Sequence, residues 1–344
     1  MKILGIETSC DETAISLVED GRSIMSNVIA SQVEIHARYG GIVPEVASRQ
    51  HMLEIVPTLR SSLDEADIDM SALDAIAVTN GPGLAGALLV GVNFAKAISF
   101  SRDLQLIGVN HLEGHIYANW LEDRDPEIEA GFPLICLIAS GGHTDLVLMS
   151  GHGSYKLLGR TRDDAAGEAF DKAARVLGLG FPGGPAIQKI AEAAKGTEIL
   201  PRAWLRGTYD FSFSGIKTAL LNKAKETGIY PPSDEREYDK EFVVEIAAAF
   251  QLSLAEVMVA KTIDAAREYN CKGILLGGGV AANSVLRQMF KDKADSHLFI
   301  PSPRLCTDNG AMIASCAYFM AESGRGNIDN VDMDVNPSLK LGID

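Results

Sequence analysis

Apolar and polar positions follow one order in the first half of the chain and return in the same order in the second half. Residues 3–18 form an apolar run, a small polar turn and a second run in which apolar residues alternate with polar ones, which is typical of two strands joined by a hairpin turn. Residues 134–149 have the same pattern, and a shift of 131 positions places Ser9 on Ser140 and Thr13 on Thr144. The pattern therefore predicts two related hairpins, one in each half.

The agreement continues downstream of the hairpins. Each half has a strand, a glycine-rich turn leading into an apolar helix, a second strand and a second helix. These segments are 75–79, 80–100, 104–110 and 111–121 in the first half, and 273–276, 277–290, 297–301 and 308–320 in the second half. The same order of elements in both halves predicts a duplicated α/β unit.

The length of 344 residues exceeds what one hydrophobic core usually serves, which favours two lobes. We expect a first lobe at 1–131 and a second lobe at 132–344, with a helical insert at about 155–225. The polar segment 226–240 predicts a surface loop. The last twenty residues are acidic and contain proline, so we expect a tail that is poorly ordered or packs back on the first lobe.

The formal net charge of −15 disfavours a broad nucleic-acid-binding face. Any polyanionic partner would have to meet a local basic patch or a surface supplied by another subunit. We expect no membrane span, because the longest apolar runs, such as 84–92, are short and interrupted by glycine. The N-terminus has no long apolar segment or cleavage site of a secretory signal, and its first residues predict a strand.

The five cysteines form no C-x-x-C pair, which is typical of a reducing, cytoplasmic location. Cys10 or Cys306 could act as a thiol nucleophile, although a plain buried or loop thiol is several times more common.

Two histidines on one predicted helix are the strongest chemical signal. His111 and His115 lie four residues apart, so their imidazoles share one face of the helix and can reach one metal ion. Asp308 follows the equivalent strand of the second half and is a candidate third ligand, because ligands collect at the carboxyl ends of strands in α/β sheets. The alternatives are two unrelated surface histidines and an Asp308 that serves as a helix N-cap.

The histidine pair also invites comparison with zinc peptidases. Those enzymes carry H-E-x-x-H, with the general-base glutamate directly after the first histidine. In this chain Glu113 comes two residues after His111 and points away from the same face of the helix. The spacing therefore excludes a peptidase built on this pair.

Three glycine-rich turns could present backbone N–H groups to an anion. They are residues 140–144, Gly183 with Gly184, and residues 277–279. Together they predict a nucleotide-like ligand with a phosphate. The chain has no Walker A pattern, and no G-x-G-x-x-G opens its first strand–helix unit, which disfavours P-loop NTPases and Rossmann dehydrogenases.

The first hairpin turn carries two acidic residues, Asp11 and Glu12. Carboxylates in a hairpin aimed at phosphates would hold a metal or accept a proton, whereas the alternative is a solvated acidic turn. His143 in the second hairpin turn could donate to a phosphate or bind a metal, and its alternative is a satisfied loop histidine.

Long motifs along nearly the whole chain give a family resemblance. They are residues 5–13, 41–51, 81–88, 111–115, 140–144, 163–172, 211–217, 277–283 and 306–311. These motifs resemble those of the bacterial and mitochondrial tRNA N6-adenosine threonylcarbamoyltransferases. The resemblance implies an actin/Hsp70/sugar-kinase (ASKHA) fold of two related lobes around a nucleotide cleft. It also implies transfer of threonylcarbamoyl from threonylcarbamoyl-AMP to N6 of adenosine 37 in tRNAs reading codons that begin with A.

The resemblance also implies roles for particular residues. Iron(II), or else zinc, would be held by His111, His115 and Asp308. Asp11 and Glu12 would lie near the reacting centre. The adenylate would be bound by Ala139, Ser140, Gly141, Gly142, His143, Asp171, Gly184 and Asn283. Many members carry aspartate three residues after Gly-Gly-Pro, where this chain has Gln188, so that position has no assigned role.

The resemblance implies partners as well, namely tRNA, an inactive paralogue of the same fold and a small P-loop ATPase. A homodimer is a further expectation. The alternative function is an ATP-dependent small-molecule or sugar kinase of the same fold, which would need a catalytic aspartate and ATP but no histidine metal pair. A non-catalytic scaffold would have lost the metal and adenylate residues, which this chain retains.

Overall fold

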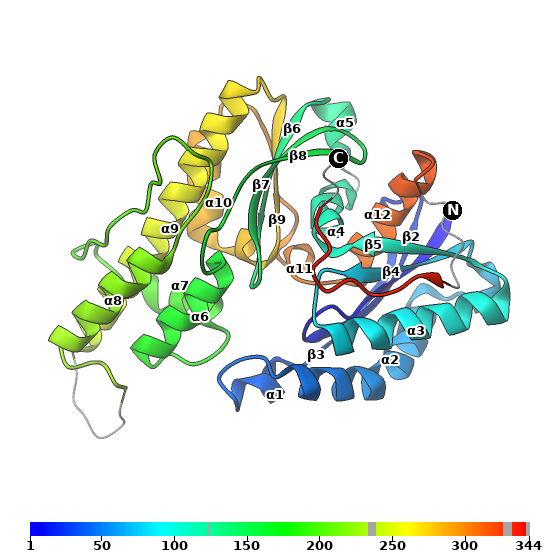
Figure 1. Ribbon diagram of the computed structural model, residues 1–344, viewed down its shortest axis with the longest axis horizontal. Helices are drawn as coiled ribbons and strands as arrows, with labels where there is room; N and C mark the ends of the chain where they lie inside the picture. Colours follow the sequence, from blue (N-terminus) through cyan, green and yellow to red (C-terminus); the bar gives the residue numbers. More distant parts are fainter. Residues whose placement is uncertain (123, 233–238, 326–331, 342–344) are drawn as a thin grey trace.

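The computed structural model describes residues 1–122, 124–232, 239–325 and 332–341, in which two five-stranded sheets lie on either side of a central layer of helices (Figure 1). The strands are β1 (Lys2–Glu7), β2 (Glu12–Glu19), β3 (Ser23–Ser31), β4 (Ala75–Gly81), β5 (Gln105–Asn110), β6 (Leu134–Ala139), β7 (Thr144–Gly151), β8 (Ser154–Arg160), β9 (Gly273–Gly277) and β10 (His297–Phe299). The α-helices are α1 (Val33–Ala37), α2 (Pro44–Ala66), α3 (Ala85–Arg102), α4 (His111–Tyr117), α5 (Pro126–Glu129), α6 (Ala166–Leu177), α7 (Gly183–Ala191), α8 (Ser214–Glu226), α9 (Lys240–Glu268), α10 (Ser284–Lys293), α11 (Pro303–Cys306) and α12 (Gly310–Glu322). Short 3₁₀ turns are η1 (Met70–Ala72), η2 (Ala118–Trp120) and η3 (Gly279–Ala282).

The two sheets have the same topology. The first sheet has the order β3-β2-β1-β4-β5 and the second has β8-β7-β6-β9-β10. In each, three antiparallel strands are followed by two strands that run parallel to the central one. The two predicted hairpins and the predicted duplicated α/β unit are therefore present.

The third strand of each meander was not predicted. β3 and β8 lie at the edges of their sheets. β8 occupies the first residues of the range in which we expected a helical insert, so in that range the helices begin only at α6. Few of their side chains are buried, one in β3 and two in β8, so neither has a clear alternation of apolar and polar residues.

Alternate residues of the central strands serve two different cores, because successive side chains of a strand point to opposite faces. In β1, Ile3 packs in the core between the two sheets, whereas Leu4 packs in the outer core of the first sheet. In β6, Ile138 packs in the same shared core and Leu137 in the outer core of the second sheet. Helices α4 and α12 supply many of the remaining side chains of the shared core, so they form a layer between the sheets.

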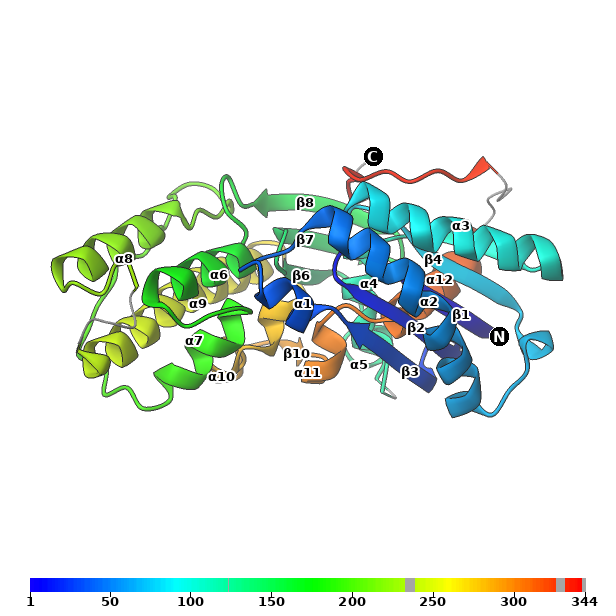
Figure 2. The same ribbon diagram turned by 90° about the horizontal axis from the view of Figure 1, so that it is seen from below.

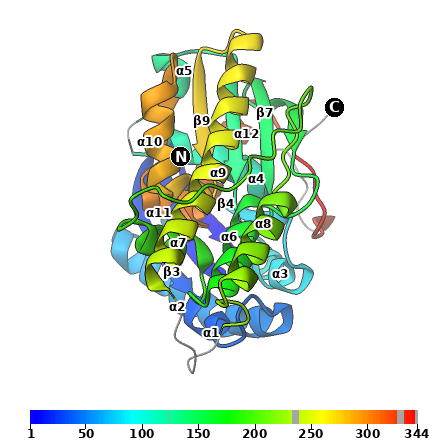
Figure 3. The same cartoon turned by 90° about the vertical axis from the view of Figure 1, so that its left-hand side faces the viewer.

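The outer faces of the sheets are covered by separate groups of helices. α2 and α3 pack on the first sheet, and α6–α9 gather at the opposite end of the molecule (Figure 2). α9 and α10 run side by side against the second sheet (Figure 3). By length and composition alone α9 is a helix that could cross a membrane, although the longest apolar runs that we considered in the sequence were shorter. Most of α9 is buried in the outer core of the second sheet, as in the core helix of a globular protein.

The C-terminal part of the chain returns to the first sheet. α12 packs on β1 and β2. Beyond it, Asn336 donates its backbone N–H to the carbonyl of Asn80, and the carbonyl of Pro337 accepts the N–H of Gly83. The described part of the expected tail therefore lies over the first sheet, while residues 326–331 and 342–344 fall outside the described residues. So do residues 233–238 of the expected surface loop. The boundary between lobes at residue 131 remains a prediction.

Candidate metal centre and adjoining cavity

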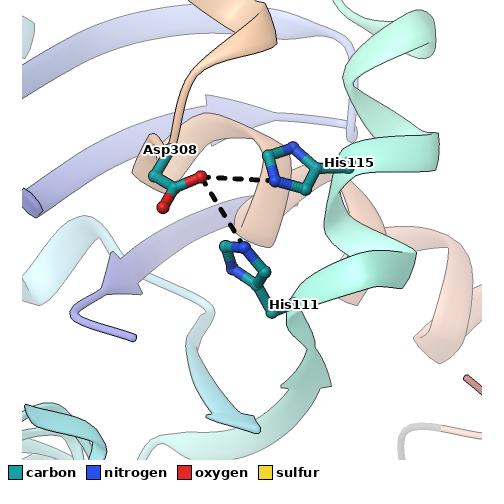
Figure 4. A group of neighbouring side chains, drawn as sticks. All are labelled: His111, His115 and Asp308. Carbon is teal, nitrogen blue, oxygen red and sulfur yellow. Dashed lines mark ion pairs between the residues drawn. The ribbon is translucent and has the colours of Figure 1, made fainter. Parts of the chain in front are cut away.

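Both histidines project from the helix that follows β5. The side chain of Asn110 accepts the N–H groups of Leu112 and Glu113, so it caps the first turn and fixes where α4 begins. His111 Nε2 lies 3.6 Å and His115 Nε2 3.2 Å from Oδ1 of Asp308 (Figure 4). The ligand atoms of the three residues lie within 4.8 Å of one another. Residues almost two hundred positions apart thus converge as the repeat predicted.

Asp308 reaches the histidines because α12 approaches β1 very closely. A Cβ on Gly5 would lie 2.1 Å from the carbonyl oxygen of Gly310, so a side chain would push the helix away from the strand. The alternative that Asp308 is the helix N-cap is wrong. Asn309 caps α12 by accepting the N–H of Met312, which leaves the carboxylate of Asp308 one residue outside the helix and facing α4.

Glu7 is a further buried acid behind the histidines, and the sequence analysis did not single it out. It ends β1 and its side chain is 0% exposed. Oε1 accepts the N–H of Ser9 at 2.5 Å, and Oε2 accepts the hydroxyl of Thr79 at 2.6 Å. Oε2 also lies 3.0 Å from Nδ1 of His111. Strand alternation places Glu7 on the same face of β1 as Ile3. An acidic residue on that buried face was the signal that could have identified it.

The protonation states suit a cation among the three residues. Burial by itself lowers the pKa of His111, but the charges of Glu7 and Asp308 outweigh it and raise that pKa to about 9. Burial raises the pKa of Asp308, yet the nearby histidines lower it to about 2. The pKa of His115 is lowered, chiefly by burial, so its ring is neutral at pH 7. A cation at this point would replace the extra proton of His111.

His115 also has the buried lone pair that a metal ligand needs. Its side chain is 0% exposed, and neither ring nitrogen forms a hydrogen bond within the described residues, although Nε2 lies near Asp308. A buried polar atom without a hydrogen-bond partner is costly, and a bound ion satisfies it. Two imidazoles and one carboxylate form a donor set typical of zinc and of non-haem iron(II), and they leave coordination positions open.

A cavity of about 750 Å³ opens beside these residues. Nine of the thirteen predicted site residues line it, namely Asp11, Glu12, His111, Ser140, Gly141, Gly142, His143, Asp171 and Asp308. Ala139, Gly184, Asn283 and His115 are not among the described residues that line it. Residues from both hairpins and from α6 therefore face one space, which is large enough for a nucleotide-sized ligand.

The second hairpin turn forms one wall of the cavity. Ser140 donates its N–H to the carbonyl of His143 and accepts the N–H of His143 on Oγ, which closes the turn. A Cβ on Gly141 or Gly142 would meet no described atom within 4 Å, so this edge is open to a ligand. Burial, followed by the nearby His111 and His115, lowers the pKa of His143 to about 4, so its imidazole is neutral at pH 7. This wall of the cavity therefore consists of small residues and the neutral imidazole of His143, which can donate or accept a hydrogen bond.

The predicted adenylate residues outside the second hairpin turn have varied surroundings. Asp171 accepts the N–H of Gly183 at the start of α7. Asn283 caps α10 and donates to Gln251, and Ala139 is buried under the turn. Gln188 accepts the backbone N–H of Ser284, which ties α7 to the start of α10. No described atom lies within 4 Å of a Cβ built on Gly184, so α7 presents an open surface there.

The first hairpin turn forms the facing wall. Oε1 of Glu12 accepts the hydroxyl of Ser31, and Oε2 has no hydrogen-bond partner within the described residues. Burial, followed by the charges of Asp11 and Asp308, raises the pKa of Glu12 to about 8. The pKa of Asp11 is raised too, chiefly by burial. Burial and the nearby carboxylates also raise the pKa of the Cys10 thiol, which therefore is not a thiolate at neutral pH.

Sequence reasoning gave no individual role to several residues of the cavity wall. Gly41 and the segment 82–84 line it and lie within the motifs that carried the resemblance. Lys172 and Arg175 from α6 also line it. Arg175 lies four residues after Asp171 on one face of α6, and this spacing was the signal that could have identified it, whereas Lys172 pairs with Asp164 and Glu168.

Comparisons with known proteins agree with these features. The profile of the family described as tRNA N6-adenosine threonylcarbamoyltransferase matches residues 23–315. The protein of that name from Dehalococcoides mccartyi is 57% identical over 341 residues, which cover 99% of this chain and 99% of that protein. Its counterpart from Thermomicrobium roseum is 56% identical over 356 residues, which cover 99% of this chain and 97% of the relative.

Among solved structures, HypF from T. kodakarensis superposes with a TM-score of 0.61 at 15% identity, over 94% of this chain and 48% of that one. This likeness concerns the fold alone. Together with the two sheets of the same topology and the family match, it bears out the ASKHA fold that the resemblance implied. The identity of more than half of all positions along nearly the whole length of the relatives is more specific. The chain belongs to the family of tRNA N6-adenosine threonylcarbamoyltransferases.

Proposed function

We propose that this protein transfers the threonylcarbamoyl group of threonylcarbamoyl-AMP to N6 of adenosine 37 in tRNA, and that the 750 Å³ cavity binds the adenylate. The observation that carries the proposal is the convergence of His111, His115 and Asp308 within 4.8 Å at the edge of that cavity. The kinase alternative gains no support from the site, and the family membership favours the transferase.

The reaction forms a bond between adenine N6 and the carbamoyl carbon and breaks the bond from that carbon to a phosphate oxygen, so AMP leaves with the electron pair. The proton of N6 must pass to an acceptor. Glu12 has a pKa of about 8 and an oxygen without a hydrogen-bond partner within the described residues, and groups with a pKa near the working pH are effective proton acceptors. Asp11, in the same wall, holds a second carboxylate near the reacting atoms.

The glycine turn faces the part of the ligand that leaves. Backbone N–H groups of Gly141 and Gly142 would receive the phosphate, and this is supported by the absence of a side chain between their backbone and the cavity. Arg175, which donates to the carbonyl of Gly40, adds positive charge to the cavity wall. Interactions that strengthen as charge develops on departing AMP lower the barrier of the step.

The metal bound by the two histidines and Asp308 is proposed to be Fe²⁺, with Zn²⁺ as the alternative. When bound, such a cation polarises a carbonyl or phosphoryl oxygen as a Lewis acid. Metal analysis of protein purified without oxygen separates the two ions. One equivalent of iron supports the first assignment, and zinc in its place overturns it.

The tRNA is proposed to be held with the help of other proteins in the cytoplasm. A net charge of −15 leaves this chain with little affinity for a polyanion by itself. We therefore propose a composite surface that includes a paralogue of the same fold and a small ATPase. Tight, salt-insensitive binding of tRNA by the isolated chain would contradict this part of the proposal.

The decisive test is incubation of the protein, with its partners, with threonylcarbamoyl-AMP and unmodified tRNA, followed by nucleoside analysis. Formation of N6-threonylcarbamoyladenosine is the expected result. A parallel reaction with ATP and small sugars tests the kinase. Phosphorylated sugar without modified adenosine would overturn the transferase assignment.

A further inference from the structure

Glu7 is an ionisable side chain buried in the middle of the molecule, beyond the reach of any ligand in the cavity. It is 0% exposed, and it does not line the cavity, whereas its neighbour Ser9 does. Burying a carboxylate in this way is costly unless hydrogen bonds compensate for the lost water. Glu7 has three partners, Ser9, Thr79 and His111, and only the last of these is a candidate metal ligand.

The donors around Glu7 determine which nitrogen of His111 carries a proton. The N–H of Ser9 can only donate, and the hydroxyl of Thr79 donates to the other oxygen. A carboxylate only accepts, so the contact of 3.0 Å with Glu7 favours a proton on His111 Nδ1, and the hydroxyl of Ser9, 3.2 Å from the same nitrogen, can accept that proton as well. Nε2 is then the nitrogen that can present a lone pair, and it is the one that faces Asp308.

We propose that Glu7 is the positioning residue of the metal centre, whose buried carboxylate holds His111 by Nδ1–H so that Nε2 is presented to the cation. This inference rests on the proposed metal site. Carboxylates that receive the second N–H of a metal-bound histidine fix its ring orientation and increase its basicity. Glu7 touches neither substrate nor cation, and it acts through His111 alone.

The substitution Glu7→Gln tests the role because the surroundings dictate the orientation of the new amide. The backbone N–H of Ser9 can only donate, so the amide oxygen must take the place of Oε1. The NH₂ group then takes the place of Oε2 and donates to Nδ1 of His111, while the hydroxyl of Thr79 rotates to accept. This arrangement keeps the packing but moves the imidazole proton to Nε2, where the cation must bind.

The experiment measures the affinity of the full-length protein for Zn²⁺ and Co²⁺ by competition with a chelator, without any assay of transfer. We expect Glu7→Gln to weaken binding by about 10–100-fold, the range known for such supporting residues. Glu7→Asp keeps an acceptor-only carboxylate with a shorter reach, and we expect an affinity between those of the wild type and Glu7→Gln. The visible spectrum of bound Co²⁺ should change in Glu7→Gln, because one ligand is weakened.

Glu113→Gln is the matched control. Glu113 is also buried, at 5% exposed, and lies on α4 between the two histidines, but its carboxylate binds Arg325 and Tyr155 and not a histidine. We expect the metal affinity of the Glu113→Gln variant to stay within about 2-fold of that of the wild type. An equal loss in Glu113→Gln would show a general effect of removing a buried charge and would overturn the inference.

The outcomes separate the inference from the proposed function. If the wild type binds neither ion, the proposed metal site fails. If the wild type binds and folded Glu7→Gln binds equally well, only the role of Glu7 fails. Nitrogen-15 spectra of the Zn²⁺-loaded wild type supply a second measurement, which is independent of whether the variants fold. A proton on Nδ1 of His111 supports the inference, and a proton on Nε2 contradicts it.

Discussion

The two hairpin turns occupy equivalent places in the two sheets, face the same cavity and carry opposite chemistry. The shift of 131 positions that aligns the halves pairs the acidic segment 10–12, Cys-Asp-Glu, with the segment 141–143, Gly-Gly-His. It also pairs Glu7, under the first turn, with the apolar Ile138 under the second. Glu7 and Ile138 both face the shared layer of helices, but only Glu7 can carry a charge.

Under the proposed function, the two copies of one duplicated unit supply two different halves of the reaction site. The first copy contributes carboxylates, which suit a cation and a proton. The second contributes small residues that leave the backbone open to the cavity, which suits a phosphate. An adenylate bound between them would meet acceptors at its reacting end and donors at its leaving end. Substitutions on either side should therefore have different kinetic effects.

The largest effect is expected from removing a ligand on the acidic side. His111→Ala should abolish metal binding and lower kcat/KM at least about 1000-fold, because it removes one of the three proposed ligands of the cation. Circular dichroism and metal analysis should show a folded protein without metal. The control is His297→Ala, which removes an exposed histidine of β10. Unchanged transfer by His111→Ala would contradict the metal role.

The next effect concerns the proton acceptor of the first turn. Glu12→Gln should lower kcat by about 100-fold or more, the range for loss of a general base, while KM for the adenylate changes little. In the wild type, kcat should rise as the pH increases toward about 8, because Glu12 must lose its proton to act. In Glu12→Gln this rise of kcat with pH should be absent. If the variant shows the same rise, the rise belongs to the titration of another group.

Glu12 should also make the protein less stable in alkali. Its pKa in the folded state, about 8, lies above the ordinary value of 4.5, so the folded protein holds this proton more tightly than the unfolded chain. The resulting stabilisation is complete below about pH 4.5 and is lost as the pH rises through about 8. At pH 9 the Glu12→Gln variant should be more stable than the wild type by on the order of 2 kcal/mol, allowing for partial solvent screening. Thermal unfolding at pH 5 and pH 9 measures the difference, and a variant that is less stable at pH 9 would contradict the sign.

On the glycine side the effect should be smaller and should appear in binding. Gly142→Val places a side chain in open space next to the phosphate position, so KM for the adenylate should rise about 10–100-fold with little change in Tm. Gly215→Val on α8 is the matched control, because a Cβ there also meets no described atom within 4 Å. An equal rise in KM for both variants would show that the turn has no special role.

The fold could be predicted where side chains alternate between two environments. The strands at the centre of each sheet have one face in the shared core and one in an outer core, and the sequence predicted them. β3 and β8 escaped because few of their side chains are buried, one in β3 and two in β8, whereas the other edge strands, β5 and β10, were predicted. A strand with so few buried side chains has no clear period-two pattern in its sequence, so its pairing is only weakly specified there.

The site was predictable as far as the duplication and the family motifs reached. The repeat brought His111 and Asp308 to equivalent strand ends, and the structure places them 3.6 Å apart. Glu7 could not be assigned in the same way, because its role depends on contacts with Thr79 and His111, 72 and 104 positions away in sequence. Only the packed structure brings these three residues together.

The smallest effect is expected from Cys10, which the repeat pairs with Gly141. Cys10 lines the cavity, but burial and the charges of Asp11 and Asp308 keep its thiol protonated, so it should not attack the carbamoyl carbon. Cys10→Ser conserves the size of the side chain and should leave kcat/KM within about 3-fold, since no interaction of the reacting atoms is lost. Wild-type Cys10 should also react slowly with iodoacetamide at pH 8. A loss of more than about 100-fold in Cys10→Ser, with metal content unchanged, would show that the first turn supplies a nucleophile as well as carboxylates.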